Sequence, residues 1–169
     1  MERLGQAAAK VLGREGFAGL TVRRVAAEAG VGAATAYTYF SSKEHLVAEV
    51  FWRRLAESPC VAYQSDDPAV RVIEVLGHIS QPVADEPEFA GAVTTALLGR
   101  DPDVEVLRLR IGRVIRDRLA EAVGADADPG VVDTLELLYS GALVRAGMGY
   151  ASYDEIARRL ETAARLLLG

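Results

Sequence analysis

The stretch AGVGAATAYTYFSSKEHL, residues 29–46, holds the side chains of this chain with the clearest binding chemistry. Residues 30–36 contain only Gly, Ala, Val and Thr, and then Tyr37 and Tyr39 follow, with Lys43 shortly behind. A phenol is stiff and can direct its hydroxyl at a phosphate oxygen, and an ammonium adds a cation nearby. We therefore expect this stretch to contact an anionic backbone, with Phe40 turned inward as an anchor.

Two short helices and a glycine turn are needed to position these groups. An apolar stripe over residues 22–29 indicates the first helix, with Thr21 as its N-cap and Gly30 free to adopt a positive φ where it ends. A second helix is predicted from about Gly32 to Tyr39. The pattern is that of a helix-turn-helix over about residues 21–40, whose slim second helix can enter a major groove about 12 Å wide.

Direct reading of bases by this second helix is expected to be limited, because alanines occupy its leading positions. Ala33 and Ala34 can touch a thymine methyl group but cannot hydrogen-bond to a base edge. Arg23 and Thr38 are the better candidates for direct readout, with groove shape supplying part of the selectivity. The candidate DNA contacts are Thr21, Arg23, Arg24, Gly32, Ala33, Ala34, Thr35, Tyr37, Thr38, Tyr39 and Lys43. For Arg24 an ordinary surface charge, and for Tyr37 core packing, are alternative interpretations.

The rest of the chain also has helical periodicity. Helix starts are predicted where an acid precedes proline, at Asp67-Pro68, Asp101-Pro102, Asp128-Pro129 and, more loosely, Asp85-Glu86-Pro87. Pro59 and Pro82 are expected to lie where helices stop. A capping box, Ser152 to Glu155, opens the last helix. Apolar stripes are predicted at Val104, Leu107, Ile111, Val114 and Leu119, and at Ile156, Leu160, Ala164 and Leu167. We predict an all-α fold of about nine helices.

The charge is divided unevenly along the chain. The net charge is −5, but residues 1–58 carry eight basic against six acidic side chains. A basic N-terminal part and an acidic remainder suggest different partners for the two. The arginine-rich run of Arg108, Arg110, Arg113, Arg116 and Arg118 alternates with an apolar stripe and is interpreted as a solvated face.

Catalytic and metal-binding groupings are missing from the sequence. There is no nucleophile beside a base, no carboxylate pair on one helix face and no phosphate-binding loop, so an enzyme, a cofactor and a metal site are not expected. His45 and His78 lie far apart in the chain, and the single cysteine, Cys60, is interpreted as a plain thiol. No apolar run of about eighteen residues indicates a membrane span.

Residues 4–46, LGQAAAKVLGREGFAGLTVRRVAAEAGVGAATAYTYFSSKEHL, resemble the N-terminal domain of the TetR (tetracycline-repressor-type) transcriptional regulators. The matching positions are Gly16-Phe17, Leu20-Thr21, Val25-Ala26, Ala29-Gly30-Val31, Thr35, Tyr37, Phe40, Lys43 and Leu46. The chain departs from the family pattern at Ala33, Ala34 and Ala36, where larger, polar or turn-forming residues are usual.

The resemblance implies a bacterial cytoplasmic homodimer with a DNA-binding domain at 1–48 and a ligand-binding and dimerisation domain at 49–169. Its dimer interface would use helices at about 130–147 and 153–168. The small residues Ser140, Gly141, Ala142, Gly147 and Gly149 would allow a partner helix to approach closely there. Candidate ligand-binding side chains are Tyr63, His78, Phe89, Thr94, Thr95 and Tyr139, each also compatible with core or surface positions.

These observations favour a ligand-responsive transcriptional regulator, and we expect a repressor. It would bind a palindromic operator in double-stranded DNA and leave it when a small molecule binds. The alternative is a helical carrier or small enzyme that has kept a degenerate DNA-binding head. The sequence does not identify the effector, the operator, the regulated genes or the sign of regulation. A basic N-terminal arm, which some family members place in the minor groove, is not evident before the first helix.

Overall fold

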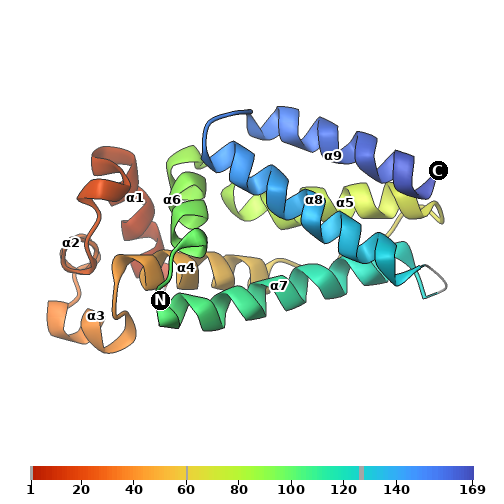
Figure 1. Cartoon of the computed structure of the whole chain (residues 1–169). Coiled ribbons are helices and arrows are strands. Elements are labelled where there is room, and N and C mark those ends of the chain that lie inside the picture. The colour runs from red at the N-terminus through yellow and green to blue at the C-terminus, as the bar shows by residue number, and fades with distance from the viewer. Residues whose placement is uncertain (1, 60, 126–127) are drawn as a thin grey trace.

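The computed structural model describes residues 2–59, 61–125 and 128–169, and all its regular structure is helical. This described part has nine helices and no strand, which confirms the all-α prediction, and Figure 1 shows how the helices are arranged. The thiol of Cys60 lies outside the described residues. The helices are α1 (Glu2–Gly19), α2 (Val22–Glu28), α3 (Ala33–Tyr39), α4 (Lys43–Glu57), α5 (Pro68–Ala84), α6 (Pro87–Leu98), α7 (Pro102–Val123), α8 (Pro129–Gly147) and α9 (Tyr153–Leu168).

Most helix starts follow the predicted caps. The side chains of Asp67, Asp101 and Asp128 accept backbone N–H groups at the starts of α5, α7 and α8, each with proline in the first turn. These carboxylates satisfy donors that a helix N-terminus leaves unpaired, and their charge suits its positive end. Glu86 precedes α6 without a side-chain cap, so the weaker of the four signals marks the helix start but supplies no capping bond.

The prediction that Pro82 ends a helix is wrong, whereas α4 does end before Pro59. Helix α5 continues past Pro82 to Ala84. A proline this close to the C-terminus removes a single backbone hydrogen bond, which the rest of the helix tolerates. The Pro82 carbonyl in turn accepts a hydrogen bond from Arg54 Nη1, 3.0 Å away, and this bond ties the end of α5 to α4.

Two predicted apolar stripes need correction. In α7 the buried position is Ile115 rather than Val114, which is only half-buried. In α9 the last predicted position, Leu167, is exposed. The N–H of Glu155 donates to Ser152 Oγ, but the Glu155 carboxylate accepts from Arg159, so the capping box at α9 is confirmed in one direction only.

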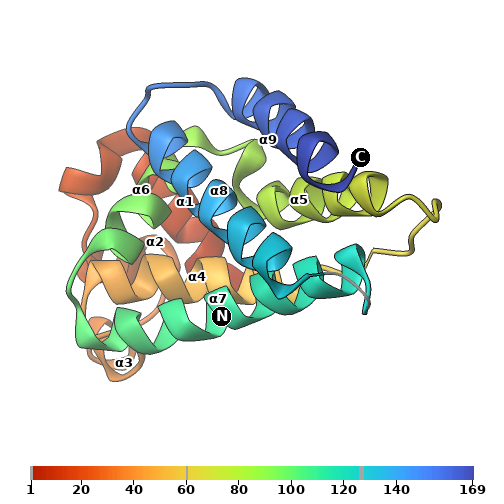
Figure 2. The same cartoon turned by 45° about the vertical axis from the view of Figure 1, so that its right-hand side comes forward.

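The helices form a small N-terminal head and a larger bundle. Figure 1 shows α1, α2 and α3 gathered at one end of the molecule and α5, α8 and α9 towards the other, with α4 and α7 running between them. Figure 2 shows the same arrangement from a second direction, with α8 and α9 again side by side. One continuous hydrophobic core runs from Leu4 in α1 to Ala164 in α9. The head is therefore packed onto the bundle rather than suspended from it.

Helix α4 belongs to both parts. Its first turn follows α3 directly, and its later residues Phe51 and Leu55 are buried among the bundle helices α6 and α7. The division into domains at 1–48 and 49–169 stays a prediction, and its boundary falls inside this helix. In the described ranges, no helix combines the length and the apolar character that crossing a bilayer requires.

Candidate nucleic-acid interface and apolar pocket

The turn between α2 and α3 has the predicted glycine geometry. Gly30 adopts a φ of 67°, and the next N–H, that of Val31, donates to the Ala26 carbonyl at 2.9 Å. A φ in this region is cheap for glycine and strained for other residues, so the sequence favours a tight turn here. Helix α3 begins after Gly32, whose backbone is extended.

The inner side of α3 is anchored in the core. Ala36 and Phe40 are buried, as predicted for Phe40, which is 1% exposed. The Phe40 ring also meets the His45 ring edge-on, with the ring centroids 5.8 Å apart. These contacts leave α3 one orientation on the head and fix which residues face outward.

The outer side of α3 carries short side chains followed by two phenols. Ala34, Thr35 and Thr38 are exposed, and Tyr37 and Tyr39 are exposed by 52% and 60%. The core-packing alternative for Tyr37 is therefore not what the structure shows. All the predicted contacts on this helix face solvent except Ala33, which is half-buried.

The hydroxyl groups of Thr38 and Thr21 differ in whether they can still donate a hydrogen bond. Thr38 Oγ1 donates its proton to the Ala34 carbonyl, 3.1 Å away, and so keeps only acceptor capacity. Thr21 Oγ1 accepts from the Arg24 N–H at 3.2 Å while capping α2, and its own proton has no acceptor in the described part of the chain. Thr21 is thus suited to donate to a phosphate oxygen, and Thr38 to accept from a base amino group or to contact a methyl group.

The cations of the head differ in how far they are already paired. Arg24 donates to Glu15 and, at 3.0 Å, to the Gly19 carbonyl, so it joins α2 to the end of α1. Lys43 Nζ donates to the Phe17 carbonyl at 2.9 Å and lies 4.3 Å from the centroid of the Phe17 ring. Arg23 is exposed and forms no hydrogen bond or ion pair with the described residues.

Arg14 of α1 and Glu28 of α2 form another ion pair in the head. Arg14 donates to Glu28 at 2.6 Å, and this hydrogen bond holds the pKa of the Glu28 carboxyl below its usual value. Carboxylates within the head therefore offset the charges of Arg14 and Arg24. Arg23 is left as the motif's least committed cation.

The bundle contains an apolar cavity of about 250 Å³ between α4, α5, α6, α7 and α8. The side chains around it are mostly aliphatic or aromatic, with Thr94, Ser140 and Arg108 as the polar ones. Such a lining is typical of small-molecule sites in proteins. The lining residues are Phe51, Val83, Ala90, Val93, Thr94, Leu97, Leu98, Arg108, Ile111, Gly112, Ile115, Tyr139, Ser140, Leu143 and Val144.

Two of the six predicted ligand-binding residues, Thr94 and Tyr139, line this cavity. Phe89 is buried in the core under the guanidinium of Arg54, and Thr95 is exposed on α6. The remaining two lie elsewhere in the bundle.

Tyr63 lines a separate, polar hollow of about 440 Å³ that is wide open to solvent beside Arg71 and Glu121. His78 lies on α5, and its buried Nδ1 has no hydrogen-bond partner among the described residues. Most residues that line the apolar cavity were not among the predicted ligand-binding residues, because residues such as Phe51, Ile111 and Leu143 have the same apolar periodicity as any core position.

The outer faces of α8 and α9 expose large aliphatic side chains. Leu137 is 74% exposed and Leu166 is 81% exposed, and a shallow groove between the helices is lined by Leu137, Leu138, Gly141 and Ala163 among others. An exposed apolar patch of this kind usually marks an interaction surface.

Two of the small residues near the end of α8 have reasons within the chain. A Cβ added at Gly147 would lie 2.5 Å from Thr94 Oγ1, so Gly147 allows α8 to approach α6. Gly149 adopts a φ of 74° in the turn that follows. Neither glycine needs a partner chain to explain it, whereas Gly141 faces open space.

A glycine-turned helix pair that exposes its second helix defines the helix-turn-helix class of DNA-binding proteins. The chain belongs to the TetR family of bacterial transcriptional regulators. The family model described as "Bacterial regulatory proteins, tetR family" matches residues 5–50, and the model described as "Tetracyclin repressor-like, C-terminal domain" matches residues 66–167. The resemblance inferred from residues 4–46 is thereby confirmed.

Similar proteins agree with this assignment. An uncharacterized HTH-type transcriptional regulator of Mycobacterium tuberculosis is 49% identical over 164 residues, which are 96% of this chain and 77% of that protein. The crystal structure of a TetR transcriptional regulator from Rhodococcus sp. RHA1 has a TM-score of 0.79 at 22% identity, covering 99% of this chain and 94% of that one. Thermus thermophilus FadR, a TetR-family transcriptional repressor crystallised in complex with lauroyl-CoA, has a TM-score of 0.69 at 22% identity, covering 99% and 92%.

Metal chemistry finds no support in the parts of the chain that the structure describes. No three His, Cys, Asp or Glu side chains gather there in a way that would hold a metal ion. The candidate sites are the exposed face of α3 and the apolar cavity.

Proposed function

We propose that this protein is a dimeric transcriptional repressor that leaves its operator when a small molecule with an apolar body fills the cavity between α4 and α8. The observation that carries the proposal is the course of α4. Phe51 of α4 lines the cavity. Lys43, the first residue of α4, follows α3 closely in the chain and donates a hydrogen bond to the Phe17 carbonyl of the head. A rigid helix between a pocket and a DNA-contacting helix provides a direct mechanical link between the two.

On DNA, α3 would lie in the major groove with its N-terminal half closest to the bases. Ala33 and Ala34 are short enough to let the Gly32 backbone approach and can contact thymine methyl groups. Arg23 and Thr38 are the proposed base-reading side chains, with Thr38 limited to accepting hydrogen bonds. The proposed backbone contacts are Thr21, Arg24, Thr35, Tyr37, Tyr39 and Lys43.

The proposed contributions of Lys43 and Arg24 to DNA affinity are modest. Lys43 already spends one of its three donors on the Phe17 carbonyl, and Arg24 is largely paired with Glu15. Both would add positive potential near the phosphates and hold the head in shape at the same time.

The proposed dimer interface is the outer face of α8 and α9. Leu137, Leu138 and Leu166 expose apolar area there, and Gly141 leaves room for a partner helix. A two-fold dimer built on this face would present two copies of α3 to a palindromic operator, with half-site centres about 34–36 Å apart.

The proposed effector class follows from the cavity and from one similar protein. The lining is apolar apart from Thr94, Ser140 and the cation Arg108 at one edge, which suits an apolar body with a polar or anionic end. Because Thermus thermophilus FadR was crystallised with lauroyl-CoA, an acyl-CoA is a reasonable first probe of this cavity.

The test is a binding measurement by fluorescence anisotropy on a pool of random duplexes, followed by addition of lauroyl-CoA to the complex. We expect affinity to fall steeply as salt rises, since phosphate contacts release counterions. Lauroyl-CoA is expected to release DNA from the wild type and to fail with Gly112→Leu, which places a side chain in the cavity.

The matched control is Gly91→Leu on α6, which has open space beside it and does not line the cavity. It should respond to the probe like the wild type. DNA binding that does not change with salt would contradict the proposed function, and release that is equal in Gly112→Leu would contradict the assignment of the cavity.

A further inference from the structure

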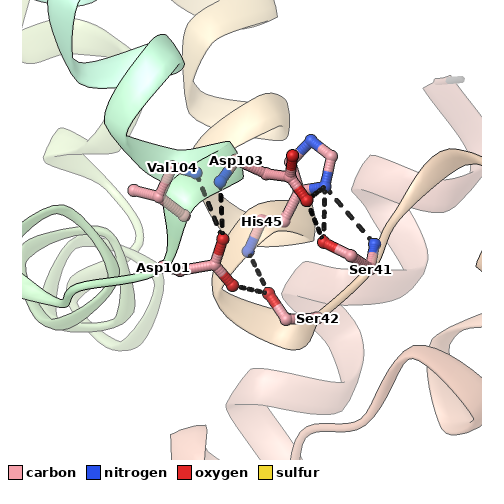
Figure 3. Close-up of polar contacts among 6 residues, drawn as sticks. All are labelled: Ser41, Ser42, His45, Asp101, Asp103 and Val104. Atoms are coloured by element: carbon pink, nitrogen blue, oxygen red, sulfur yellow. Dashed lines mark hydrogen bonds and ion pairs between the residues drawn. The ribbon is translucent and has the colours of Figure 1, made fainter.

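The N-termini of α4 and α7 are joined by a hydrogen bond between their capping residues. Ser42 Oγ accepts from the His45 N–H at 2.9 Å, which caps α4, and donates its own proton to Asp101 Oδ2 at 2.6 Å (Figure 3). Asp101 meanwhile caps α7, with Oδ1 accepting from the N–H of Asp103 at 2.9 Å and of Val104 at 3.3 Å. One carboxylate thus lies at the positive ends of two helices, one leading from the head and one in the bundle.

A second contact lies beside the first. Ser41 Oγ donates to Asp103 Oδ2 at 2.5 Å, and the Ser41 N–H donates to His45 Nδ1 at 3.4 Å. Figure 3 shows Ser41, Ser42 and His45 on the head side facing Asp101 and Asp103 at the start of α7. We call the two bonds Ser42–Asp101 and Ser41–Asp103 the clasp.

The clasp holds the chain directly after the recognition helix. Helix α3 ends at Tyr39, and Phe40, Ser41 and Ser42 are the only residues between it and α4. Two of these three are bonded to α7, and Phe40 is buried in the core. A shift of the first turn of α7 would therefore be passed to the C-terminal end of α3.

The same end of α7 lies next to the cavity. Arg108, about two turns beyond the cap, lines the cavity and donates to the carbonyls of Leu97 and Gly99, both at 2.7 Å, so that it binds the end of α6 to α7. Ligand sites commonly have volumes of about 300 Å³ or more. The cavity of about 250 Å³ lies just below that range, so we expect a bound ligand to widen it by moving a wall to which α6 or α7 contributes.

We propose that Ser41, Ser42, Asp101 and Asp103 are positioning residues for operator binding, and that the clasp sets the angle of α3 relative to the bundle and hence the half-site spacing of the dimer. This inference rests on the proposed function and adds a route by which the cavity acts on α3. The clasp joins the head to the bundle at the start of α7, whereas α4 joins them through its own course into the bundle.

The test uses Ser42→Asp. Asp and Ser cap helices about equally well, so α4 keeps its cap, while two carboxylates now face each other across the clasp. We expect the affinity for the duplex selected by the wild type to fall about tenfold, within the usual range of coupling between sites. We also expect a selection with this variant to tolerate several half-site spacings.

The double variant Ser42→Asp, Asp101→Asn is the rescue. The amide introduced at position 101 can cap α7 and donate to the carboxylate introduced at position 42, which restores one bond with reversed polarity. Affinity and the single preferred spacing should return. Equal losses in the single and double variants would overturn the proposal, as would an unchanged affinity and spacing in Ser42→Asp.

Asp103→Ala provides a second route that leaves both caps in place and removes the acceptor of Ser41, together with the carboxylate that lies 3.8 Å from His45 Nδ1. If the wild type selects no duplex, the proposed function fails, and the clasp is judged without DNA. Hydrogen exchange of the α3 amides should then be faster in Ser42→Asp and Asp103→Ala and normal in the double variant, and equal exchange in all four proteins would refute the clasp.

Discussion

Several arginines of the bundle bind the carbonyls at helix ends, whereas the paired arginines of the head bind mainly to carboxylates. In the head, Arg14 and Arg24 pair with the carboxylates of Glu28 and Glu15 on neighbouring helices. In the bundle, Arg118 donates to the carbonyls of Leu55 and Ser58, where α4 ends. Arg71 donates to the Ala122 carbonyl at the end of α7. Arg108 donates to the Leu97 carbonyl at the end of α6.

The contrast shows how one residue type serves two purposes. The last carbonyls of a helix lack partners within it, and a guanidinium that reaches them satisfies the acceptors and suits the negative helix end. In the bundle these bonds fasten helix ends together. In the head, pairing with Glu28 and Glu15 offsets the charges of Arg14 and Arg24, whereas Arg23 is exposed and has no such partner among the described residues.

The largest effect is expected from placing a negative charge on the face of α3. Ala34→Glu should weaken DNA binding by about 100-fold or more, because a carboxylate facing phosphates and base edges meets like charge and loses solvent. The fold should be unaffected, since Ala34 is exposed. Anisotropy against the selected duplex measures the loss, and Ala56→Glu, exposed near the other end of α4, is the control that should bind normally.

Removing a bundle arginine should affect stability. Arg118→Ala strands the carbonyls at the end of α4 and is expected to lower the free energy of unfolding by about 1.5–3 kcal/mol, the range for charged hydrogen bonds. Urea titration followed by circular dichroism measures it. Arg113→Ala on the same helix, at an exposed position with no bond to the described residues, should change stability by less than about 0.5 kcal/mol. Equal effects would remove the distinction between capping and surface arginines.

Removing Arg23, which has no hydrogen bond or ion pair with the described residues, should affect binding alone. Arg23→Ala is expected to weaken DNA binding by about tenfold and, if it contacts a phosphate, to reduce the slope of log affinity against log salt by about one. The melting temperature should stay at the wild-type value. Arg24→Ala is the informative neighbour, because its loss breaks the pairs to Glu15 and the Gly19 carbonyl and should lower stability more than affinity. The reverse pattern would exchange the roles assigned to the two residues.

The smallest effect is expected from the charge at the clasp. The hydrogen bond from Ser42 lowers the pKa of Asp101, so the unfolded chain binds its proton more readily than the folded one. The resulting stability is present above the ordinary carboxyl pKa of about 3.9 and is lost as pH falls through the lower folded value. Asp101→Asn keeps the cap and should cost about 0.3–1 kcal/mol near neutral pH, a difference that disappears in acid. A difference that grew on acidification would contradict this assignment.

The head could be predicted from the sequence because its signals are local. Thr21 and Gly30 act on backbone groups three residues away, and Phe40 is buried as expected. The family match confirms what residues 4–46 suggested. The DNA contacts themselves stay predictions, although the exposure of Tyr37 and Tyr39 agrees with them.

The cavity and the arginine bonds could not be predicted, because they depend on helices far apart in the chain. Arg118 reaches Leu55 and Ser58 across about sixty residues, so the interpretation of residues 108–118 as a solvated face is wrong for Arg118, and Arg108 and Arg116 are also bonded within the chain. Nothing in the sequence relates Ser42 to Asp101. Their meeting depends on how α4 and α7 cross, which is a property of the packed core.

The most direct test of the central claim, that two copies of α3 read DNA symmetrically, is to sequence the duplexes that the wild-type protein retains from a random pool. The account predicts an inverted repeat with half-site centres about 34–36 Å apart, roughly one helical turn or a multiple of it. It also predicts thymine near the positions facing Ala33 and Ala34. A single unrepeated half-site, or a strict guanine requirement opposite Ala33, would contradict the symmetric docking of α3.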